Sequence, residues 1–398
     1  MKRVGLCGGT FDPLHNGHVA LVKAAVDSGQ IDQCFVMPAG RPPHKQHQIV
    51  SPAAYRLAMV EKAFAHMPAV VVSDMEIHQK GRSYTLDTVK RLLPKLEPDS
   101  ELVLIYGSDI LIDLEQWHQP QDILNLCPLL LARRGGYDPL QMDRLADKMR
   151  QKFKARIDFF DCPELDVSSH AIRDDITRKK PWRHQVPEAV GRFIEYHGFY
   201  QYAGDLDRIE PAIWHQLLDY ETRIWPLFTR KRLLHSLNVM LACLHLAMIH
   251  KVPLEKAGLA GLIHDCAKCL PRKEQMELAK KSGDDSMLEQ DLAHAPAGMV
   301  LAREQLNVTD EDVLRAIFCH TTGCPEMSPL AMILFLCDKI EPSRHYERLQ
   351  PIRDLAEKDL RQAMLLCVEE INLFLVRSKL APHPYTLQLV AKLQSETQ

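Results

Sequence analysis

Residues 8–18 join a short apolar run to a helical pattern through a glycine-rich turn, and this junction constrains the fold more than any other part of the chain. The run before the turn, residues 4–7, is apolar and bounded by glycine, which is typical of a buried parallel strand. Residues 19–25 continue with the apolar spacing of a helix. The sequence therefore predicts a strand-to-helix junction near its start.

The backbone of this turn is suited to binding an anion. Unpaired N–H groups gather at the N-terminus of a helix, and Gly8 and Gly9 let an anion approach without a Cβ in the way. His15 and His18 stand three residues apart, so both fall on one face of the opening turn and can donate to neighbouring phosphate oxygens. Nucleotidyl transfer needs such donors and in-line positioning rather than a nucleophilic side chain. The motif predicts a nucleotide-phosphate site with His15 and His18 as its catalytic pair.

Over residues 1–202, short apolar runs alternate with helical patterns. Strands are expected at residues 4–7, 33–37, 70–73, 102–106, 129–132 and 157–160. This alternation is typical of an α/β doubly wound parallel sheet, in which ligands bind beyond the carboxyl ends of the strands. Gly107, Asp109 and Arg133 follow two of these strands, so we expect them to gather beside the glycine-rich turn.

A second anion site is expected at residues 168–173. Ser168 and Ser169 open a helix, and Arg173 follows one turn later. Serine hydroxyls and free N–H groups can bind phosphate oxygens, and the guanidinium of Arg173 supplies a planar cationic fork. We expect this segment to bind the β- and γ-phosphates of a nucleotide.

The strand alternation stops near residue 204, and long amphipathic patterns such as residues 233–249 and 330–340 predict an all-α helical bundle. A chain of 398 residues is long enough for two cores, so we expect domains at 1–202 and 213–398 with a linker at 203–212. Apolar helical segments of the second half carry His235, His264, Asp265, His294, His320 and Asp338. Such side chains are costly inside a bundle unless they are paired or bind metal, and the ordered set favours a metal site.

Composition narrows the class of partner. A net charge of −3 argues against a general nucleic-acid-binding surface, so the basic clusters at 178–180 and 230–232 are interpreted as solvated faces. No apolar leader and no segment long enough for a membrane span is recognised, so we expect a cytoplasmic protein without a membrane partner. The 11 scattered cysteines are expected as reduced thiols. The sequence leaves open whether the chain forms a homo-oligomer.

The motifs of the first half resemble those of nucleotidyltransferases with a His-x-Gly-His signature, and more narrowly those of bacterial nicotinate-nucleotide adenylyltransferases. The resemblance covers residues 1–202 and includes residues 40–45, 83–88, 107–109 and 186–200. It implies adenylyl transfer from ATP, which brings Mg²⁺, to nicotinate mononucleotide, giving deamido-NAD and pyrophosphate. It also implies that Trp117 stacks on the pyridine ring, that the backbone near Thr85 receives its carboxylate, and that Lys45 holds phosphate. The implied ATP contacts are Gly8, Gly9, Thr10, Phe11, Gly107, Asp109, Arg133, Ser168, Ser169 and Arg173.

The second half resembles HD domains, whose ligands follow the order His…His-Asp…His…His…Asp. More narrowly, residues 264–268, 294–298, 320–323 and 338–342 resemble bacterial HD hydrolases that split diadenosine tetraphosphate symmetrically into two ADP. The resemblance implies two divalent ions on the six residues above, bridged by Asp265, with Lys268 meeting a substrate phosphate. A mixed nitrogen and oxygen ligand set suits iron or manganese and leaves magnesium open.

Three residues depart from the patterns of these families. His170 stands where threonine is usual, Ser108 where alanine is commoner, and Cys324 where arginine is usual. Two alternatives stay open. The first domain could be a phosphopantetheine adenylyltransferase or a cytidylyltransferase, although Trp117 and residues 83–88 argue against it. The HD half could sense a nucleotide without turnover, or hydrolyse another nucleotide.

Overall fold

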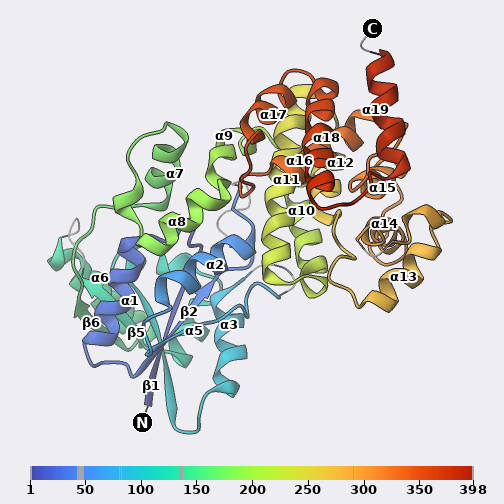
Figure 1. The fold of residues 1–398 in the computed structure, drawn as a ribbon. Coiled ribbons are helices and arrows are strands. Elements are labelled where there is room, and N and C mark those ends of the chain that lie inside the picture. The colour runs from blue at the N-terminus through green and yellow to red at the C-terminus, as the bar shows by residue number, and fades with distance from the viewer. Residues whose placement is uncertain are drawn as a thin grey trace. The chain divides into compact units, whose positions relative to one another are not determined.

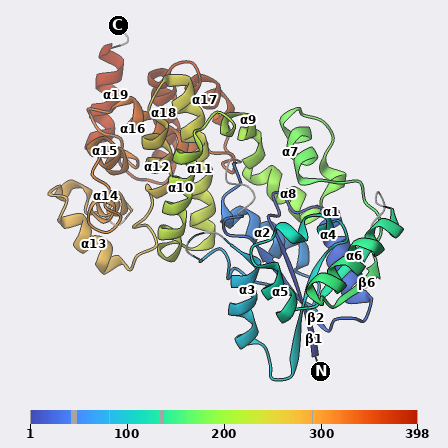
Figure 2. The ribbon, with the colours of Figure 1, turned by 180° about the vertical axis from the view of Figure 1, so that it is seen from behind.

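The computed structural model describes residues 2–42, 49–79, 81, 83–133, 138–289 and 291–396 (Figures 1 and 2). The chain divides into two compact units, Met1–Ile194 and Glu195–Gln398. Lys45, expected from the sequence to hold phosphate, lies outside the described residues.

The first unit is built on a parallel sheet of six strands, in the order β3-β2-β1-β4-β5-β6. The strands are β1 (Lys2–Gly9), β2 (Gln33–Pro38), β3 (Val70–Val72), β4 (Ser100–Gly107), β5 (Leu129–Arg133) and β6 (Ile157–Asp161). Each apolar run that the sequence singles out forms one of these strands. The doubly wound α/β fold expected for the first half is therefore confirmed.

Helices pack on both faces of this sheet (Figure 1). The helices up to residue 197 are α1 (Asn16–Asp27), α2 (Ala53–Phe64), α3 (Thr85–Leu92), α4 (Ile110–Asp113), α5 (Pro120–Leu126), α6 (Pro139–Phe153), α7 (Ser169–Thr177) and α8 (Glu188–His197), the last of which continues into the second unit. Leu6 of β1 and Leu104 of β4 belong to a buried cluster with residues of α3, α4, α5 and α6, while α1 and α2 pack against the other face. Alternate strand residues point to opposite faces, so both sets of helices find an apolar surface.

β1 and β4 are neighbours at the centre of the sheet, although two other strands separate them in the sequence. The connections after these strands lead to opposite faces, which leaves a crevice beyond their carboxyl ends. Gly9 ends β1 and Gly107 ends β4, so both expected site segments begin at this crevice.

The second unit is helical, and no strand occurs among its described residues. After a short 3₁₀ turn at Phe199–Tyr202, its helices are α9 (Ala203–Leu206), α10 (Pro211–Ile224), α11 (Arg230–His250), α12 (Leu254–Ile263), α13 (Arg272–Lys280), α14 (His294–Glu304), α15 (Glu311–Cys319), α16 (Pro329–Ile340), α17 (Leu349–Ala356), α18 (Leu360–Arg377) and α19 (Pro384–Glu396). Thr229, Asp310, Ser328 and Asp359 cap α11, α15, α16 and α18, because each side chain accepts a hydrogen bond from a backbone N–H of the first turn. The all-α bundle expected for the second half is confirmed.

Helix α11 corrects one expectation drawn from the sequence. Its length and composition alone would suffice to cross a membrane, whereas no segment of that kind was expected. Most of its residues are buried inside the second unit, where it packs against α12 and α16. A central core helix passes the same test of length and apolar content.

Candidate functional sites

A cavity of about 620 Å³ opens at the carboxyl ends of the central strands of the first unit. Its wall includes Gly8, Gly9, Thr10, Glu76, Ser83, Tyr84, Thr85, Thr88, Tyr106, Trp117 and His118. Five residues expected from the sequence, Gly8, Gly9, Thr10, Thr85 and Trp117, therefore line one cavity. Gly107, Asp109 and Arg133 lie at the same edge of the sheet but are not part of this wall.

The turn after β1 is held in one conformation by buried groups. Phe11 is 1% exposed and has a φ of 52°, and its ring lies where a side chain on Gly9 would have to stand, 2.9 Å from a Cβ built there. Arg56, also 1% exposed, donates from its guanidinium to the carbonyl oxygens of Thr10 at 3.0 Å and Ala39 at 2.6 Å. The loops after β1 and β2 are thus tied together, which fixes the backbone that faces the cavity.

His15 and His18 stand at the start of α1, with His15 as its N-cap residue. The backbone N–H of His15 donates to Nδ1 of His18 at 3.2 Å, and the two rings stack with their centroids 3.7 Å apart. Because Nδ1 of His18 accepts this bond, the ring proton resides on Nε2. His18 is therefore a hydrogen-bond donor through Nε2 at the positive end of a helix.

The second expected anion segment lies against the first. The hydroxyl of Ser169 donates to the carbonyl oxygen of Pro13 at 2.9 Å, and Nη1 of Arg173 donates to that of Asp12 at 2.5 Å. Ser168 caps α7, accepting from the N–H of Ala171 at 3.1 Å. The structure thus brings both segments together, and contacts of these three side chains with phosphate stay a prediction.

The remaining first-unit candidates occupy separate places along the sheet edge. Trp117 lines the cavity and meets the ring of Tyr106 edge to face, 5.3 Å between centroids. Thr85 opens α3 in the cavity wall, where the helix N-terminus favours an anion. Arg133 is paired with Asp143 at 2.8 Å and lies over the ring of Phe159.

Glu76 is a cavity residue that the sequence analysis missed. It is buried and accepts a hydrogen bond from the hydroxyl of Thr88 at 2.6 Å. Burial raises the pKa of Glu76, although hydrogen bonds from Thr88 and Ser83 oppose that shift. The hydroxyl oxygen of Ser83 also accepts from the N–H of Gly40 at 3.1 Å, so the carboxyl group connects α3 with the loop after β2. A single glutamate between two motifs forms no recognisable sequence pattern, so its place in the cavity could not be predicted.

In the second unit, all six expected ligands converge, although they come from five parts of the bundle. His235 lies on α11, His264 and Asp265 follow α12, His294 opens α14, His320 follows α15, and Asp338 lies on α16. Nε2 of His235 is 3.0 Å from Asp338, and Nε2 of His264 is 3.4 Å from Asp265. Nε2 of His294 and of His320 lie 3.4 Å and 3.6 Å from the other oxygen of Asp265. Two overlapping groups of ligand atoms result, His235 with His264 and Asp338, and His264 with Asp265 and His320.

Two of these imidazoles, those of His264 and His320, share one orientation. Nδ1 of His264 donates to the carbonyl oxygen of Gly261 at 2.8 Å, and Nδ1 of His320 to that of Ile317 at 2.6 Å. Since a carbonyl oxygen can only accept, both rings keep their lone pair on Nε2, which faces the centre. Nε2 of His264 is buried and has no hydrogen-bond partner among the described residues. These donors fit a divalent cation, which prefers neutral imidazole with the other ring nitrogen bonded outward.

The charges around this centre also suit a metal. Burial and the neighbouring His320 lower the pKa of His294 to about 3, so its ring is neutral at neutral pH. Burial opposes ionisation of Asp265 and Asp338, but hydrogen bonds from the surrounding groups, and the cation of Lys339 beside Asp338, hold both pKa values well below the ordinary range. Neutral imidazoles and ionised carboxylates are the forms in which these side chains bind metal.

Four cationic side chains surround the six ligands. Nη1 of Arg232 is 2.6 Å from Asp265, and Nη2 of Arg344 is 3.1 Å from Asp338. Lys339 also pairs with Asp338, and Lys268 lies 3.1 Å from Nδ1 of His294. Interpreting residues 230–232 as a solvated face was therefore wrong for Arg232. It stands three residues before His235 on α11, which puts both side chains on one helical face.

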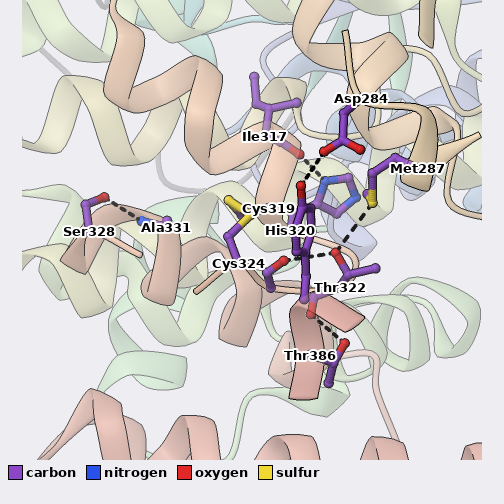
Figure 3. Close-up of a disulfide and its surroundings, with 12 residues drawn as sticks. Asp284, Met287, Ile317, Cys319, His320, Thr322, Cys324, Ser328, Ala331 and Thr386 are labelled. Atoms are coloured by element: carbon purple, nitrogen blue, oxygen red, sulfur yellow. Dashed lines mark hydrogen bonds between the residues drawn. A yellow bond between two sulfur atoms is a disulfide. The ribbon is translucent and has the colours of Figure 1, made fainter. Parts of the chain in front are cut away.

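The loop that carries His320 is closed by a disulfide between Cys319 and Cys324, whose Cα atoms are 5.5 Å apart (Figure 3). The expectation of reduced thiols is wrong for this pair, while the other nine cysteines, all among the described residues, form no disulfide. The turn over Thr322 and Gly323, with a φ of 71° at Gly323, brings the two sulfurs together. The sequence separation of 5 residues between the two cysteines was not enough to predict this disulfide. Cys324, which replaces the usual arginine, thus holds the loop that presents His320.

Comparison with known proteins separates the same two halves. Residues 6–175 match the cytidylyltransferase-like family, and residues 232–343 match the HD domain family. A probable nicotinate-nucleotide adenylyltransferase of Lachnoclostridium phytofermentans is 35% identical over 200 residues, which cover 50% of this chain and 100% of that protein. A probable nicotinate-nucleotide adenylyltransferase/Ap4A hydrolase of Mycoplasma pneumoniae is 29% identical over 371 residues, 92% of this chain and 98% of that protein. A solved Clostridium acetobutylicum structure, titled a predicted HD superfamily hydrolase involved in NAD metabolism, has 35% identity over 46% of this chain and 97% of its own, with a TM-score of 0.43.

Proposed function

The chain belongs to the nicotinate-nucleotide adenylyltransferase family and carries an HD domain, and from this we propose that it is a bifunctional enzyme with one reaction in each unit. The first unit transfers the adenylyl group of ATP to nicotinate mononucleotide and releases pyrophosphate. The second hydrolyses diadenosine tetraphosphate to two ADP. The relative from Mycoplasma pneumoniae, whose name combines both activities, supports this pairing in one chain.

In the first reaction, a phosphate oxygen of the mononucleotide attacks the α-phosphorus of ATP, and the bond to the pyrophosphate leaving group breaks. Nε2–H of His18 donates to the phosphate oxygens on which charge grows, and His15 packs against it at the N-terminus of α1. Arg173 approaches the same turn through the carbonyl of Asp12, where it can meet the leaving phosphates. Mg²⁺ arrives with ATP. The observation that most directly supports this reaction is that Nε2 of His18, beside the glycine turn, carries a proton and can donate a hydrogen bond.

The acceptor half of the same site is the cavity wall that contains Trp117. Its indole offers an apolar face to a flat pyridine ring, and Thr85 presents a helix N-terminus to the ring's carboxylate. These features favour nicotinate mononucleotide over a phosphopantetheine or cytidylyl substrate. Contacts of Gly107, Asp109 and Arg133 with ATP, and of Lys45 with phosphate, are part of the proposal.

In the second reaction, the convergence of four imidazoles and two carboxylates is the observation that carries the proposal. We propose that His235, His264, Asp265, His294, His320 and Asp338 would hold two divalent ions, iron or manganese. Such ions would supply a hydroxide near neutral pH and neutralise charge on phosphate oxygens. Lys268 and Arg232, beside His294 and Asp265, are placed to bind the phosphate chain.

The proposal is tested by incubating the purified chain with ATP and nicotinate mononucleotide, and separately with diadenosine tetraphosphate, and by identifying the products by mass. We expect deamido-NAD with pyrophosphate from the first mixture and ADP alone from the second. Nicotinamide mononucleotide and phosphopantetheine serve as competing acceptors. Formation of ATP and AMP from the tetraphosphate would contradict symmetric cleavage, and binding without turnover would favour the sensor alternative.

Several sequence-based expectations remain predictions of the same proposal. They are a cytoplasmic location, small nucleotides rather than nucleic acids or membranes as partners, and a domain boundary between residues 202 and 213. Size measurement of the purified chain decides whether it forms a homo-oligomer.

A further inference from the structure

Glu341 is a buried carboxylate to which neither reaction above assigns a role. It directly follows α16, three residues after Asp338, and it is 1% exposed. Its Oε1 accepts from Nδ1 of His235 at 3.2 Å and from the hydroxyl of Ser343 at 2.6 Å. Its Oε2 accepts from the amide of Asn238 at 2.8 Å and from the N–H of Ser343 at 2.7 Å. Four donors thus surround one carboxylate, which compensates for its burial.

The other donors around Glu341 fix its role towards His235. Both carboxylate oxygens accept from N–H or O–H groups of Asn238 and Ser343, so Nδ1 of His235 faces an acceptor and carries a proton. Nε2 then points at the centre of the candidate metal site, 3.0 Å from Asp338. In the metal-free chain Nε2 donates to Asp338, and a cation bound there would replace that proton.

The chain of hydrogen bonds continues away from the site through Asn238. This residue is fully buried on α11, three residues after His235, so both side chains lie on one helical face. Nδ2 of Asn238 donates to Glu341, and the same amide group contacts Nδ1 of His197, which lies 3.2 Å from Nδ2 and 3.3 Å from Oδ1. His197 ends α8, is 8% exposed and belongs to the second unit.

We propose that the buried chain His197–Asn238–Glu341 positions His235 for metal binding, with Glu341 as the residue that fixes its tautomer and ring orientation. This inference rests on the proposed two-metal site. His264 and His320 have backbone carbonyls in the same role, whereas His235 has a carboxylate, which makes its imidazole a stronger electron donor to a cation. Loss of such an outer partner typically weakens metal binding about 10- to 100-fold.

The test uses the full chain depleted of metal and titrated with Co²⁺, whose visible absorption reports the ligands and geometry directly. Glu341→Gln preserves size but removes the charge. We expect its affinity for Co²⁺ to fall about 10- to 100-fold, with an altered absorption spectrum, while adenylyl transfer is unchanged. Glu357→Gln is the matched control, because Glu357 accepts from His245, away from the metal site, and the same chemical change there leaves Co²⁺ binding unaltered.

Two further variants grade the effect. Glu341→Asp keeps the charge and shortens the side chain, and its Co²⁺ affinity should lie between those of the wild type and Glu341→Gln. His197 lies two hydrogen bonds further from His235 than Glu341 does. His197→Gln should therefore weaken Co²⁺ binding less than either change at Glu341. If Glu341→Gln does not fold, as judged by loss of helical circular dichroism, the comparison rests on Glu341→Asp and His197→Gln.

The outcomes separate this inference from the proposed function. Unchanged affinity and spectrum in Glu341→Gln, with Co²⁺ bound by the wild type, overturn the positioning role alone. A wild-type chain that binds no Co²⁺ overturns the metal site itself, and the inference with it.

Discussion

His18 in the first unit and His264 in the second are the same residue type in opposite hydrogen-bonding states. Nδ1 of His18 accepts from a backbone N–H, so Nε2 carries the proton and can donate to phosphate. Nδ1 of His264 donates to a backbone carbonyl, so Nε2 carries the lone pair and can bind a cation. The comparison teaches that the backbone group facing Nδ1 decides which chemistry a histidine offers at Nε2.

The largest effect is expected from Asp265→Ala, which removes the carboxylate that lies within 4.0 Å of four imidazole nitrogens in the second unit. Because two ions bound there would supply several kcal/mol of transition-state stabilisation, hydrolysis of diadenosine tetraphosphate should fall by at least about a thousandfold. Adenylyl transfer should not change. Elemental analysis should show less metal than in the wild type, and full occupancy would remove Asp265 from the ligand set.

His18→Ala tests the other half of the comparison, the histidine of the first unit that donates a hydrogen bond to phosphate. Loss of a donor that acts mainly in the transition state should lower kcat for adenylyl transfer about a hundredfold or more, with hydrolysis unaffected. The control is His66→Ala, since His66 is exposed in the turn between α2 and β3, outside both expected phosphate segments. Equal losses in both reactions would show that the two sites are not independent.

Trp117→Ala tests the acceptor side of the first site. Loss of a stacked indole should raise the apparent KM for nicotinate mononucleotide about tenfold and leave that for ATP nearly unchanged. Steady-state kinetics with each substrate varied in turn gives the answer. A change confined to the KM for ATP would reassign Trp117 to the nucleotide side.

A smaller effect, on stability, is expected from changing His245. This histidine represents a third hydrogen-bonding state, because both of its ring nitrogens face carboxylates. A hydrogen bond from Nδ1 to Asp205 at 2.6 Å is the main cause that raises its pKa, and Glu357 adds to it. The protonated ring stabilises the fold below the unfolded pKa of about 6.5, and this contribution is lost as pH rises through the higher folded pKa.

The measurement compares urea denaturation midpoints of the wild type and His245→Gln from about pH 5.5 to pH 9. We expect the wild type to be more stable at the acid end, with the difference shrinking as pH rises. A difference that grows with pH would mean that His245 is neutral in the folded chain.

Sequence patterns predicted the features that depend on residues close together in the chain. All six strands were found because each is a short apolar run bounded by turn residues, and the six ligands of the second unit were found because each sits on an apolar helical segment in a recognisable order. The pairing of His15 with His18 could be predicted as well, because the two residues share one helical turn.

What the sequence missed depends on elements that meet only after folding. Arg232 reads as part of a basic cluster, and only the packing of α11 beside residue 265 turns it towards the site. Glu341 follows a ligand in the sequence, but its partner Asn238, and His197 beyond that residue, are more than a hundred residues earlier. Tautomers are likewise invisible in the sequence, because they follow from which backbone group faces each ring.

Nitrogen NMR of the histidine rings tests the central claim most directly, because the chemical shifts of Nδ1 and Nε2 distinguish the two neutral tautomers. The sample is the metal-free full chain at neutral pH, with signals assigned through His18→Ala and His264→Ala. The account predicts the proton on Nε2 in His18 and on Nδ1 in His264. The same tautomer in both residues would contradict it.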